Sequence, residues 1–291
     1  MLDAKTILFV ALGLVAVVFI VAWWRSASGG ADAARPGPLG LAIGFVTNFF
    51  DTLGIGSFAP TTSIFKLKGL LPDEQIPGTL NVGHAVPTIV QAFIFIAIVK
   101  VEMTTLAALI AASVAGAWLG AGLVASWPRR RVQLGMGLAL LAAASFFAMT
   151  NLNVFPAGGN ALGLQSPLLW VGIAGNFMLG ALMTLGIGLY APCMILIALL
   201  GMNPQAAFPI MMGSCAFLMP VGGLRFIAKG SYNLKAALGL TIGGFPAVLL
   251  AAFVIKSLPL VYLRWLIFAV VLYTAIAMLR SAAAAKPSSP A

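Results

Sequence analysis

The residues of this chain that could perform chemistry gather in two glycine-rich stretches. The first, residues 51–60, reads DTLGIGSFAP, and the second, residues 184–192, reads TLGIGLYAP. Glycine lets the backbone adopt otherwise strained angles and approach a ligand closely. A helix that begins after such a break presents unpaired N–H groups and a partial positive charge. Each stretch is therefore suited to hold the oxygens of an anion such as a sulfonate, sulfite or carboxylate.

We expect the substrate site to draw on both stretches and on the polar residues just before them. The expected substrate-binding residues are Asn48, Thr52, Gly54, Gly56, Ser57, Asn176, Thr184, Gly186 and Gly188. Ser57 can cap the helix after the first break. Pro60 and Pro192 are expected to be structural, since proline is tolerated in the first turn of a helix. Glycines also let membrane helices pack closely, but packing alone does not require the same break in both halves.

Two titratable residues are candidates for coupling or gating. Asp51 is the only acidic residue within an apolar segment, where an ionised side chain is costly unless it is paired or near water. It either carries a coupling proton or cation, or caps the neighbouring half-helix. His84 is the sole histidine and acts either as a hydrogen-bonded packing residue or as a proton relay. Cys193 and Cys215 show no metal-ligand spacing, so neither a metal nor a cofactor is expected.

The composition places these residues in a membrane. The chain is 62% apolar and 8% charged, which is too little polar surface for a soluble domain. Apolar residues occupy every face of the long segments, which predicts helices rather than the strands of a barrel. The net charge of +10 does not indicate nucleic-acid binding, because the Lys and Arg residues lie in short connections between apolar segments. They indicate membrane topology instead.

Nine apolar segments follow one another along the chain. They are residues 6–24, 38–65, 76–99, 104–127, 132–149, 167–200, 206–226, 234–255 and 261–279. The first is longer than the core of a signal peptide, which favours a retained helix over a cleaved signal. The two segments that carry the glycine-rich stretches are longer than one simple span requires.

Counting positive charges decides how those two long segments are placed. If all nine segments cross the membrane, the Lys and Arg residues divide eight against eight. If the two broken segments instead turn back as re-entrant hairpins, the division becomes twelve against four. The second division fits the positive-inside rule. We therefore predict seven crossing helices and two hairpins, with the N-terminus outside and the C-terminus in the cytoplasm.

The two glycine-rich stretches belong to a longer internal repeat. An offset of 132 residues also pairs Gly69 with Gly201 and Pro72 with Pro204. Each copy has one hairpin and three crossings, an odd number, so the two copies are expected to be inverted. The predicted fold is an all-α integral membrane protein of two inverted repeats preceded by one extra transmembrane helix. The predicted divisions are residues 1–36 (N-terminal helix and linker), 37–150 (first repeat), 151–166 (loop) and 167–291 (second repeat and tail).

These motifs resemble the TauE/SafE family of membrane permeases, the sulfite exporter and 4-toluene sulfonate uptake group, over about residues 39–279. The matching residues are Gly40, Gly44, Gly54, Gly56, Pro60, Gly172, Gly180, Gly186, Gly188 and Pro192, with Gly116, Gly120, Gly122 and the sequence 127–129 (WPR) further on. Ser57 and Leu189 depart from the family pattern, where glycines are usual. The resemblance implies movement of sulfite, sulfoacetate or other organosulfonates across the bacterial inner membrane.

A secondary transporter is therefore the leading hypothesis, because no ATP-binding loop is present and duplicated breaks suit alternating access at a midplane site. The expected partners are a small anion and membrane lipid; proton or cation coupling and a homodimer stay open. An anion channel or carboxylate permease is the alternative. An intramembrane enzyme lacks a nucleophile paired with a base, and a scaffold would not require duplicated breaks.

Overall fold

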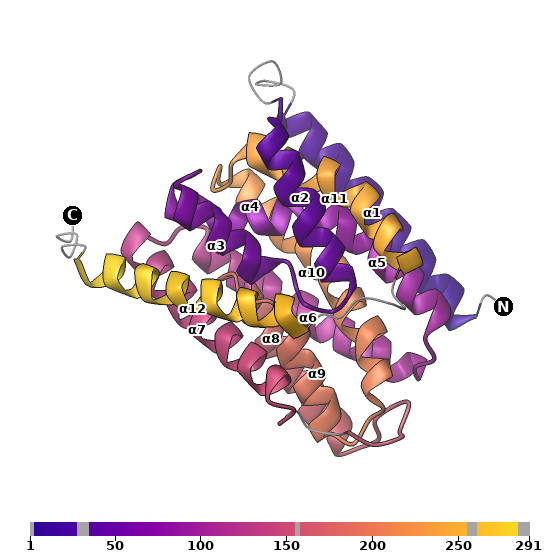
Figure 1. Cartoon of the computed structure of the whole chain (residues 1–291). Helices are drawn as coiled ribbons and strands as arrows, with labels where there is room; N and C mark the ends of the chain where they lie inside the picture. Colours follow the sequence, from indigo (N-terminus) through magenta and orange to yellow (C-terminus); the bar gives the residue numbers. More distant parts are fainter. Residues whose placement is uncertain (1–2, 28–34, 155–157, 255–260, 285–291) are drawn as a thin grey trace.

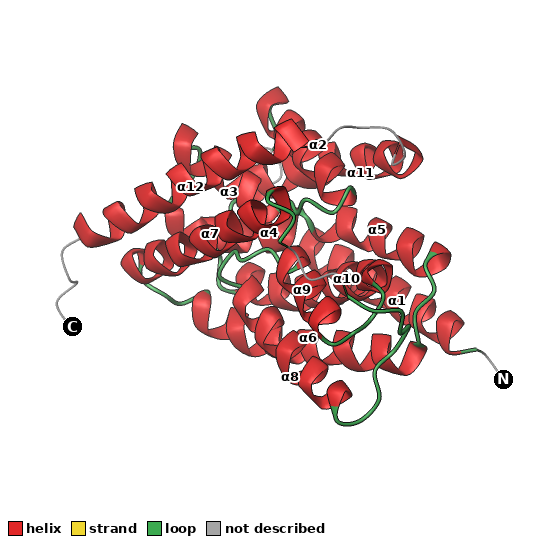
Figure 2. Cartoon of the chain, turned by 60° about the horizontal axis from the view of Figure 1, so that its bottom comes forward, coloured by secondary structure: helices red, strands yellow, loops and turns green. Residues whose placement is uncertain are grey.

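The computed structural model describes residues 3–27, 35–154, 158–254 and 261–284, and these residues form helices (Figures 1 and 2). The helices are α1 (Ala4–Ala27), α2 (Pro38–Thr52), α3 (Phe58–Lys68), α4 (Ile76–Gly83), α5 (Ala85–Ile98), α6 (Met103–Val124), α7 (Arg129–Asn151), α8 (Leu168–Met183), α9 (Tyr190–Leu199), α10 (Ala207–Ala228), α11 (Leu234–Val254) and α12 (Val261–Ala284). Two short 3-10 turns, η2 (Asp73–Gln75) and η3 (Pro204–Ala206), precede α4 and α10. Within these ranges, extended pairing is limited to one bridge between Ala161 and Met202.

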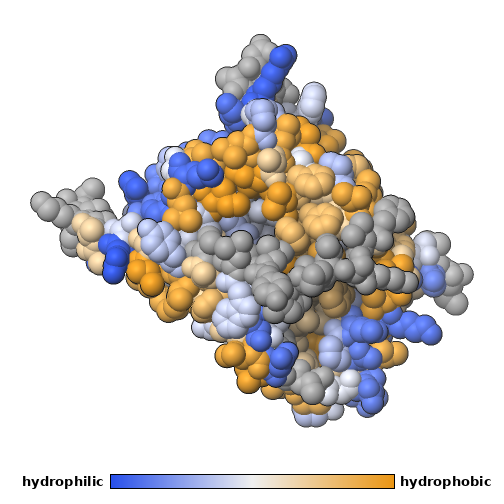
Figure 3. Space-filling model, viewed as in Figure 1, coloured by the Kyte–Doolittle hydropathy of each residue, from blue (hydrophilic) through white to orange (hydrophobic). Residues whose placement is uncertain are grey.

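Six helical segments in the described part of the chain are long and apolar enough to cross a membrane. They are α1, η2–α5, α6, α7, η3–α10 and α11. Helix α12 is also 24 residues long. Apolar side chains cover much of the face seen in Figure 3, and hydrophilic ones gather toward its edges. The all-helical membrane fold predicted from composition is thus confirmed at this level.

Both long apolar segments are broken at the glycine-rich stretches. Helices α2 and α3 have 15 and 11 residues, and α8 and α9 have 16 and 10. At 1.5 Å per residue, each is shorter than the roughly 30 Å hydrocarbon core. Gly54, Gly56 and Gly186 have φ angles of 86°, 89° and 93°, which side-chain-bearing residues rarely adopt. These glycines end the first helix of each pair.

The first helix of each broken pair packs closely on a helix from the other half of the chain. Helix α2 lies on α11, where a Cβ on Gly44 would collide with the Gly239 carbonyl oxygen. Helix α8 lies on α6, where a Cβ on Gly180 would collide with the Ser113 carbonyl oxygen. Small residues thus allow backbone contact between helices, as is common in membranes.

The second helices of the two pairs end at opposite ends of α6. The end of α3 is joined to η2 by the ion pair of Lys66 and Asp73, whose atoms are 2.6 Å apart. Arg129, just beyond α6, also lies 3.5 Å from the Asp73 carboxylate. After α9, the Asn203 amide donates to the Ala161 carbonyl, in the loop that also contacts the start of α6. The C-terminal ends of α3 and α9 therefore point away from each other, and the two glycine-rich breaks lie between them.

The apolar segment 76–99 forms two helices, α4 and α5, which are interrupted at His84. Pro87 has no N–H and cannot donate to the Gly83 carbonyl four residues earlier. The Thr241 hydroxyl of α11 donates to that carbonyl instead, at 2.7 Å. The proline therefore explains both the interruption and a polar contact between α4 and α11.

Helix α1 lies against α10 and α5 and leaves one side bare. Phe19 is fully buried near Gly223 of α10. Leu14, Val17 and Val18 are each about 60% exposed, at 62%, 59% and 59%. An exposed apolar side on a helix of this length is suited to contact with lipid tails.

Candidate functional site

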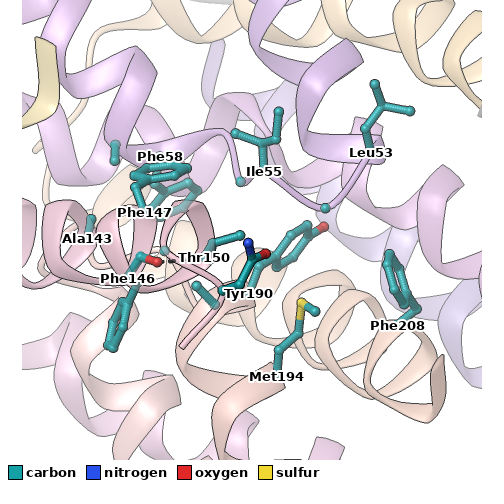
Figure 4. A pocket seen from close by; sticks show the side chains of 16 residues that line it. Leu53, Ile55, Phe58, Ala143, Phe146, Phe147, Thr150, Tyr190, Met194 and Phe208 are labelled. Atoms are coloured by element: carbon teal, nitrogen blue, oxygen red, sulfur yellow. Dashed lines mark hydrogen bonds between the residues drawn. The ribbon is translucent and has the colours of Figure 1, made fainter. Parts of the chain in front are cut away.

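A cavity of about 430 Å³ lies where the two breaks meet (Figure 4). Its volume is in the range of small-molecule sites. The described lining residues are Leu53, Gly54, Ile55, Gly56, Phe58, Ala59, Ala143, Phe146, Phe147, Thr150, Asn153, Gly188, Tyr190, Ala191, Met194 and Phe208. In Figure 4, Tyr190 lies near the centre of the view, and Phe146 and Phe208 lie on opposite sides of it.

The two breaks contribute residues at matching positions to this cavity. Gly56 and Gly188, Phe58 and Tyr190, and Ala59 and Ala191 are each separated by the repeat offset, and all six line the cavity. A Cβ on Gly188 would lie 3.9 Å from the Phe58 Cβ, so the two breaks are close neighbours. The predicted meeting of the two breaks is therefore present in the structure.

Backbone N–H groups at both breaks lack the usual helical partners. Among the described residues, no backbone acceptor is found for the amides of 187–191, and the same holds for Gly56, Phe58 and Ala59. These amides belong to the first turns of α9 and α3 or to the residues just before them. An unsatisfied amide in hydrocarbon costs several kcal/mol, so such groups are suited to a polar ligand or water.

The rest of the cavity wall is mostly apolar. Phe146 and Phe147 of α7, Met194 of α9 and Phe208 of α10 supply most of its bulk. No Lys, Arg or His is found among the described lining residues. Backbone dipoles without a cationic side chain suit a ligand with one negative charge and an apolar body.

A buried hydrogen-bonded cluster lies behind Tyr190. The Gln91 amide nitrogen donates to Asp51 Oδ2 at 2.8 Å and to Thr52 Oγ1 at 3.0 Å. The Tyr190 hydroxyl lies 2.6 Å from Gln91 Oε1 and 3.3 Å from Asp51 Oδ2. Ser57 lines the same small cavity as the Asp51 carboxylate. The cluster joins α2, α5 and α9 across the two halves of the chain.

A second, smaller cavity of about 10 Å³ separates Asp51 from the second break. This volume is close to what one water molecule needs. Its lining includes Asp51, Ser57, Thr88 and Cys215, and it shares Gly56, Phe58, Gly188 and Tyr190 with the larger cavity. Phe58 and Tyr190 are therefore the side chains common to both cavities, and the Tyr190 hydroxyl is the one that lies beside Asp51.

Six of the predicted substrate-binding, coupling or gating residues line neither cavity: Asn48, Thr52, His84, Asn176, Thr184 and Gly186. Asn48 donates to the Gly44 and Leu240 carbonyls, and its Oδ1 lies 3.0 Å from His84 Nδ1. The other ring nitrogen of His84 lies 3.1 Å from the Thr61 hydroxyl, so His84 is a fully buried bridge between α2 and α3. His84 therefore has the contacts of a hydrogen-bonded packing residue, one of its two expected roles, and its role in coupling or gating stays a prediction.

Asn176, Thr184 and Thr52 also serve packing or the buried cluster. Asn176 donates to the Leu109 carbonyl at 2.6 Å and to the Ser214 hydroxyl at 2.9 Å, and thereby connects α8 to α6 and α10. Thr184 donates to the Ala181 carbonyl within its own helix end. Thr52 contacts Gln91 rather than the cavity. None of the three is a direct ligand in this structure.

The helix-break residues differ in role. Gly186 faces Met136 and Leu80 and lines neither cavity, so only Gly54, Gly56 and Gly188 of the four glycines reach the larger one. Ser57 makes no side-chain cap bond to α3, which corrects the expectation of a cap. It lines the smaller cavity beside Asp51 instead.

Pro60 and Pro192 occupy the third positions of α3 and α9, in the first turn as predicted. There the missing N–H leaves no helical bond unmade, because the first four amides have no partner within the helix.

Tyr190, Gln91 and the residues of α7 were not predicted. Tyr190 lies within the second glycine-rich stretch and is the polar counterpart of Phe58. Gln91 is a buried amide in an apolar segment, a signal that could have identified it. Thr150 and Asn153 lie at the C-terminal end of α7, which no motif connects to the breaks.

Comparisons with protein-family models, curated protein sequences and solved structures give no match for this chain. The resemblance to the TauE/SafE family therefore depends on the motif residues alone.

Proposed function

We propose that this protein is a secondary transporter that moves sulfur-containing anions across the bacterial inner membrane. The observation that carries the proposal is the cavity bounded by matching residues of both glycine-rich breaks. Discontinuous helices whose N-terminal ends point at a shared site are the usual anion site of repeat-built transporters. The predicted organosulfonates suit this cavity better than inorganic sulfite, because most of its wall is apolar.

The arrangement of the helix ends supports two inverted repeats with re-entrant hairpins. The ends of α3 and α9 lie at opposite ends of α6, and α2 and α8 each pack on a helix of the other half. In this topology the basic ends of α3, α7 and α10 face the cytoplasm, the N-terminus lies outside and the C-terminus lies inside. Alternating access then consists of one half moving against the other around the cavity.

The test is flux into proteoliposomes of purified protein, with sulfite, sulfoacetate and 4-toluenesulfonate compared. We expect 4-toluenesulfonate to give the largest flux, because it combines one negative charge with an apolar body. A simple carboxylate, benzoate, measured in parallel separates sulfonate specificity from a general carboxylate permease. Uptake that saturates and shows counterflow of preloaded anion supports a carrier rather than a channel. Absence of flux for all four anions in folded protein would contradict the proposal.

A further inference from the structure

Asp51 occupies the N-terminal end of α3, where the first anion-binding half-site was expected. It lies at the end of α2 and lines the smaller cavity together with Ser57, which immediately precedes α3. Gln91 of α5 donates to the same carboxylate at 2.8 Å. An acidic group at a helix N-terminus compensates its partial positive charge. The protein thus places a carboxylate of its own at one of the two breaks.

The second break has no such carboxylate. The residue that corresponds to Asp51 by the repeat offset is Met183, which is buried and also lines the smaller cavity. Tyr190 and Ala191 of the first turn of α9 line the larger cavity, and their amides have no backbone acceptor among the described residues. The amides of Phe58 and Ala59 at α3 lack one too, but there the anion meets Asp51, so α9 is the end where its donors are free of a competing carboxylate.

The side chains of Phe58 and Tyr190 lie between the larger cavity and the smaller one beside Asp51, and only that of Tyr190 is polar. The Tyr190 ring lines both cavities, and its hydroxyl lies 3.3 Å from the carboxylate. A hydroxyl carries a single proton, so Tyr190 can donate to Gln91 or to Asp51 but not to both. Two negative charges on either side of this ring repel each other strongly in a water-poor interior.

The other titratable groups near Asp51 do not neutralise it. Tyr190 faces it from α9 and Cys215 from α10, and the hydrogen bonds from His84 reach it through Asn48, Thr52 and Gln91. The ion pairs found within the described residues all involve Asp73 or Glu74, so none brings a Lys or Arg to Asp51. A proton is the simplest cation that can remove the negative charge of the carboxylate without a new ligand set.

We infer that each anion is carried together with one proton held on Asp51. The inference rests on the proposed function and adds the coupling ion to it. An oxygen–hydrogen bond forms on the Asp51 carboxylate with a proton taken from water on one side, and it breaks when the proton is released on the other side. With a monovalent sulfonate the proton and the anion cancel, so transport is electroneutral. The two roles considered for Asp51 are then one: it caps α3 when ionised and gives way to the substrate when protonated.

The experiment follows 4-toluenesulfonate and protons together in proteoliposomes that contain a pH-sensitive dye. For the wild type we expect uptake to acidify the lumen, an inward proton gradient to concentrate the anion, and a valinomycin-clamped potential to have no effect. Asp51→Asn should exchange labelled anion at a rate independent of pH and should neither move protons nor concentrate the anion. Glu74→Gln, an acid outside both cavities, is the matched control and should keep the wild-type behaviour.

Tyr190→Phe gives an independent test of the positioning role of the tyrosine hydroxyl. Its removal takes a donor from the ionised carboxylate, so Asp51 keeps its proton to higher pH and half-maximal anion binding should move to higher pH. A merely structural role would lower binding without moving the midpoint. Wild-type flux without proton movement, or concentration of the anion by Asp51→Asn, would overturn the coupling and leave the transporter proposal intact. Failure of the wild type to carry any anion would overturn the transporter proposal itself.

Discussion

The four glycines of the breaks look alike in sequence but meet different surroundings. Gly186 has a φ angle of 93° and faces Met136, whereas Gly188, two residues later, faces the cavity and lies outside the left-handed region. The first glycine is required by the backbone, because a side chain in the left-handed region costs about 1–2 kcal/mol. The second is required only by the space that it leaves for ligand.

This difference predicts opposite effects of substitution. Gly186→Ala should lower the stability of the detergent-solubilised protein by about 1–2 kcal/mol, because its Cβ also approaches Met136 Cε at 3.1 Å. Gly188→Ala should keep the wild-type melting temperature, since its Cβ makes an ordinary contact at 3.9 Å. Gly188→Leu should also fold but reduce 4-toluenesulfonate flux to that of empty vesicles. Normal flux in Gly188→Leu would remove the cavity from the transport route.

Sequence reasoning found the breaks but not all the side chains that surround them. The paired glycines, prolines and offset were sufficient to predict that two helices end in the interior. They could not show which of Asn48, Thr52 or Tyr190 points into the cavity, because side-chain direction depends on the helices that pack nearby. Polar residues one turn before each break were expected to bind substrate. They hold helices together instead, since a buried side-chain amide needs a hydrogen-bond partner, and Asn48 and Asn176 find theirs in carbonyls of neighbouring helices.

At the scale of elements, the start of α6 depends on a single side chain. Glu102 is the N-cap of this helix and accepts from the backbone N–H of Thr104 at 2.8 Å and of Thr105 at 2.6 Å. Although partial burial opposes ionisation, the bonds from Thr105 and Thr104 lower the pKa of Glu102 to about 2 from 4.5. Its own N–H donates to the Leu162 carbonyl at 2.8 Å, so the cap also fixes the loop between the two halves.

Loss of this cap should destabilise the protein in a pH-dependent manner. Glu102→Ala is expected to cost about 1 kcal/mol at neutral pH, the usual value of an N-cap. Because the pKa is lower in the folded state, this contribution is complete above about pH 4.5 and disappears as the pH falls toward 2. The difference in melting temperature between wild type and Glu102→Ala should therefore be large at pH 7 and small near pH 3.

Glu74→Ala is the control for this measurement, since its carboxylate lies 4.0 Å from Arg129 and caps no long helix. It should shift the melting temperature little at either pH. An equal loss for both variants would mean that the cap bonds do not stabilise α6.

At the scale of the whole molecule, the two halves use corresponding helices differently. Helix α7 lines the larger cavity from Ala143 to Thr150, and Asn153, just beyond the helix, is an exposed part of the same lining. Its counterpart by the repeat offset is α12, where Ala275 corresponds to Ala143 and is fully buried. The positions of the breaks were predictable from sequence, because they repeat locally. The sequence could not predict which of the two helices, α7 or α12, lines the cavity. That choice depends on how helices distant in sequence pack in the conformation described.

If the repeats are inverted and access alternates, the roles of α7 and α12 should exchange. We therefore expect cysteines introduced at Ala143 and Ala275, in a background with Cys193 and Cys215 replaced by alanine, to react with an impermeant maleimide from opposite sides of the membrane. Ala143→Cys should react from outside in the conformation described. Ala275→Cys should react only from the cytoplasmic side, in the opposite conformation, where α12 would line the cavity.

The decisive feature of this measurement is reciprocity. A gradient of 4-toluenesulfonate that raises labelling at one position should lower it at the other, because a single cavity cannot open to both sides at once. The native buried cysteines supply the background control, since a protein retaining them without the new cysteines should label slowly from either side. Labelling of both positions from the same side would contradict the inverted topology. Parallel changes at the two positions would instead contradict alternating access and favour a channel.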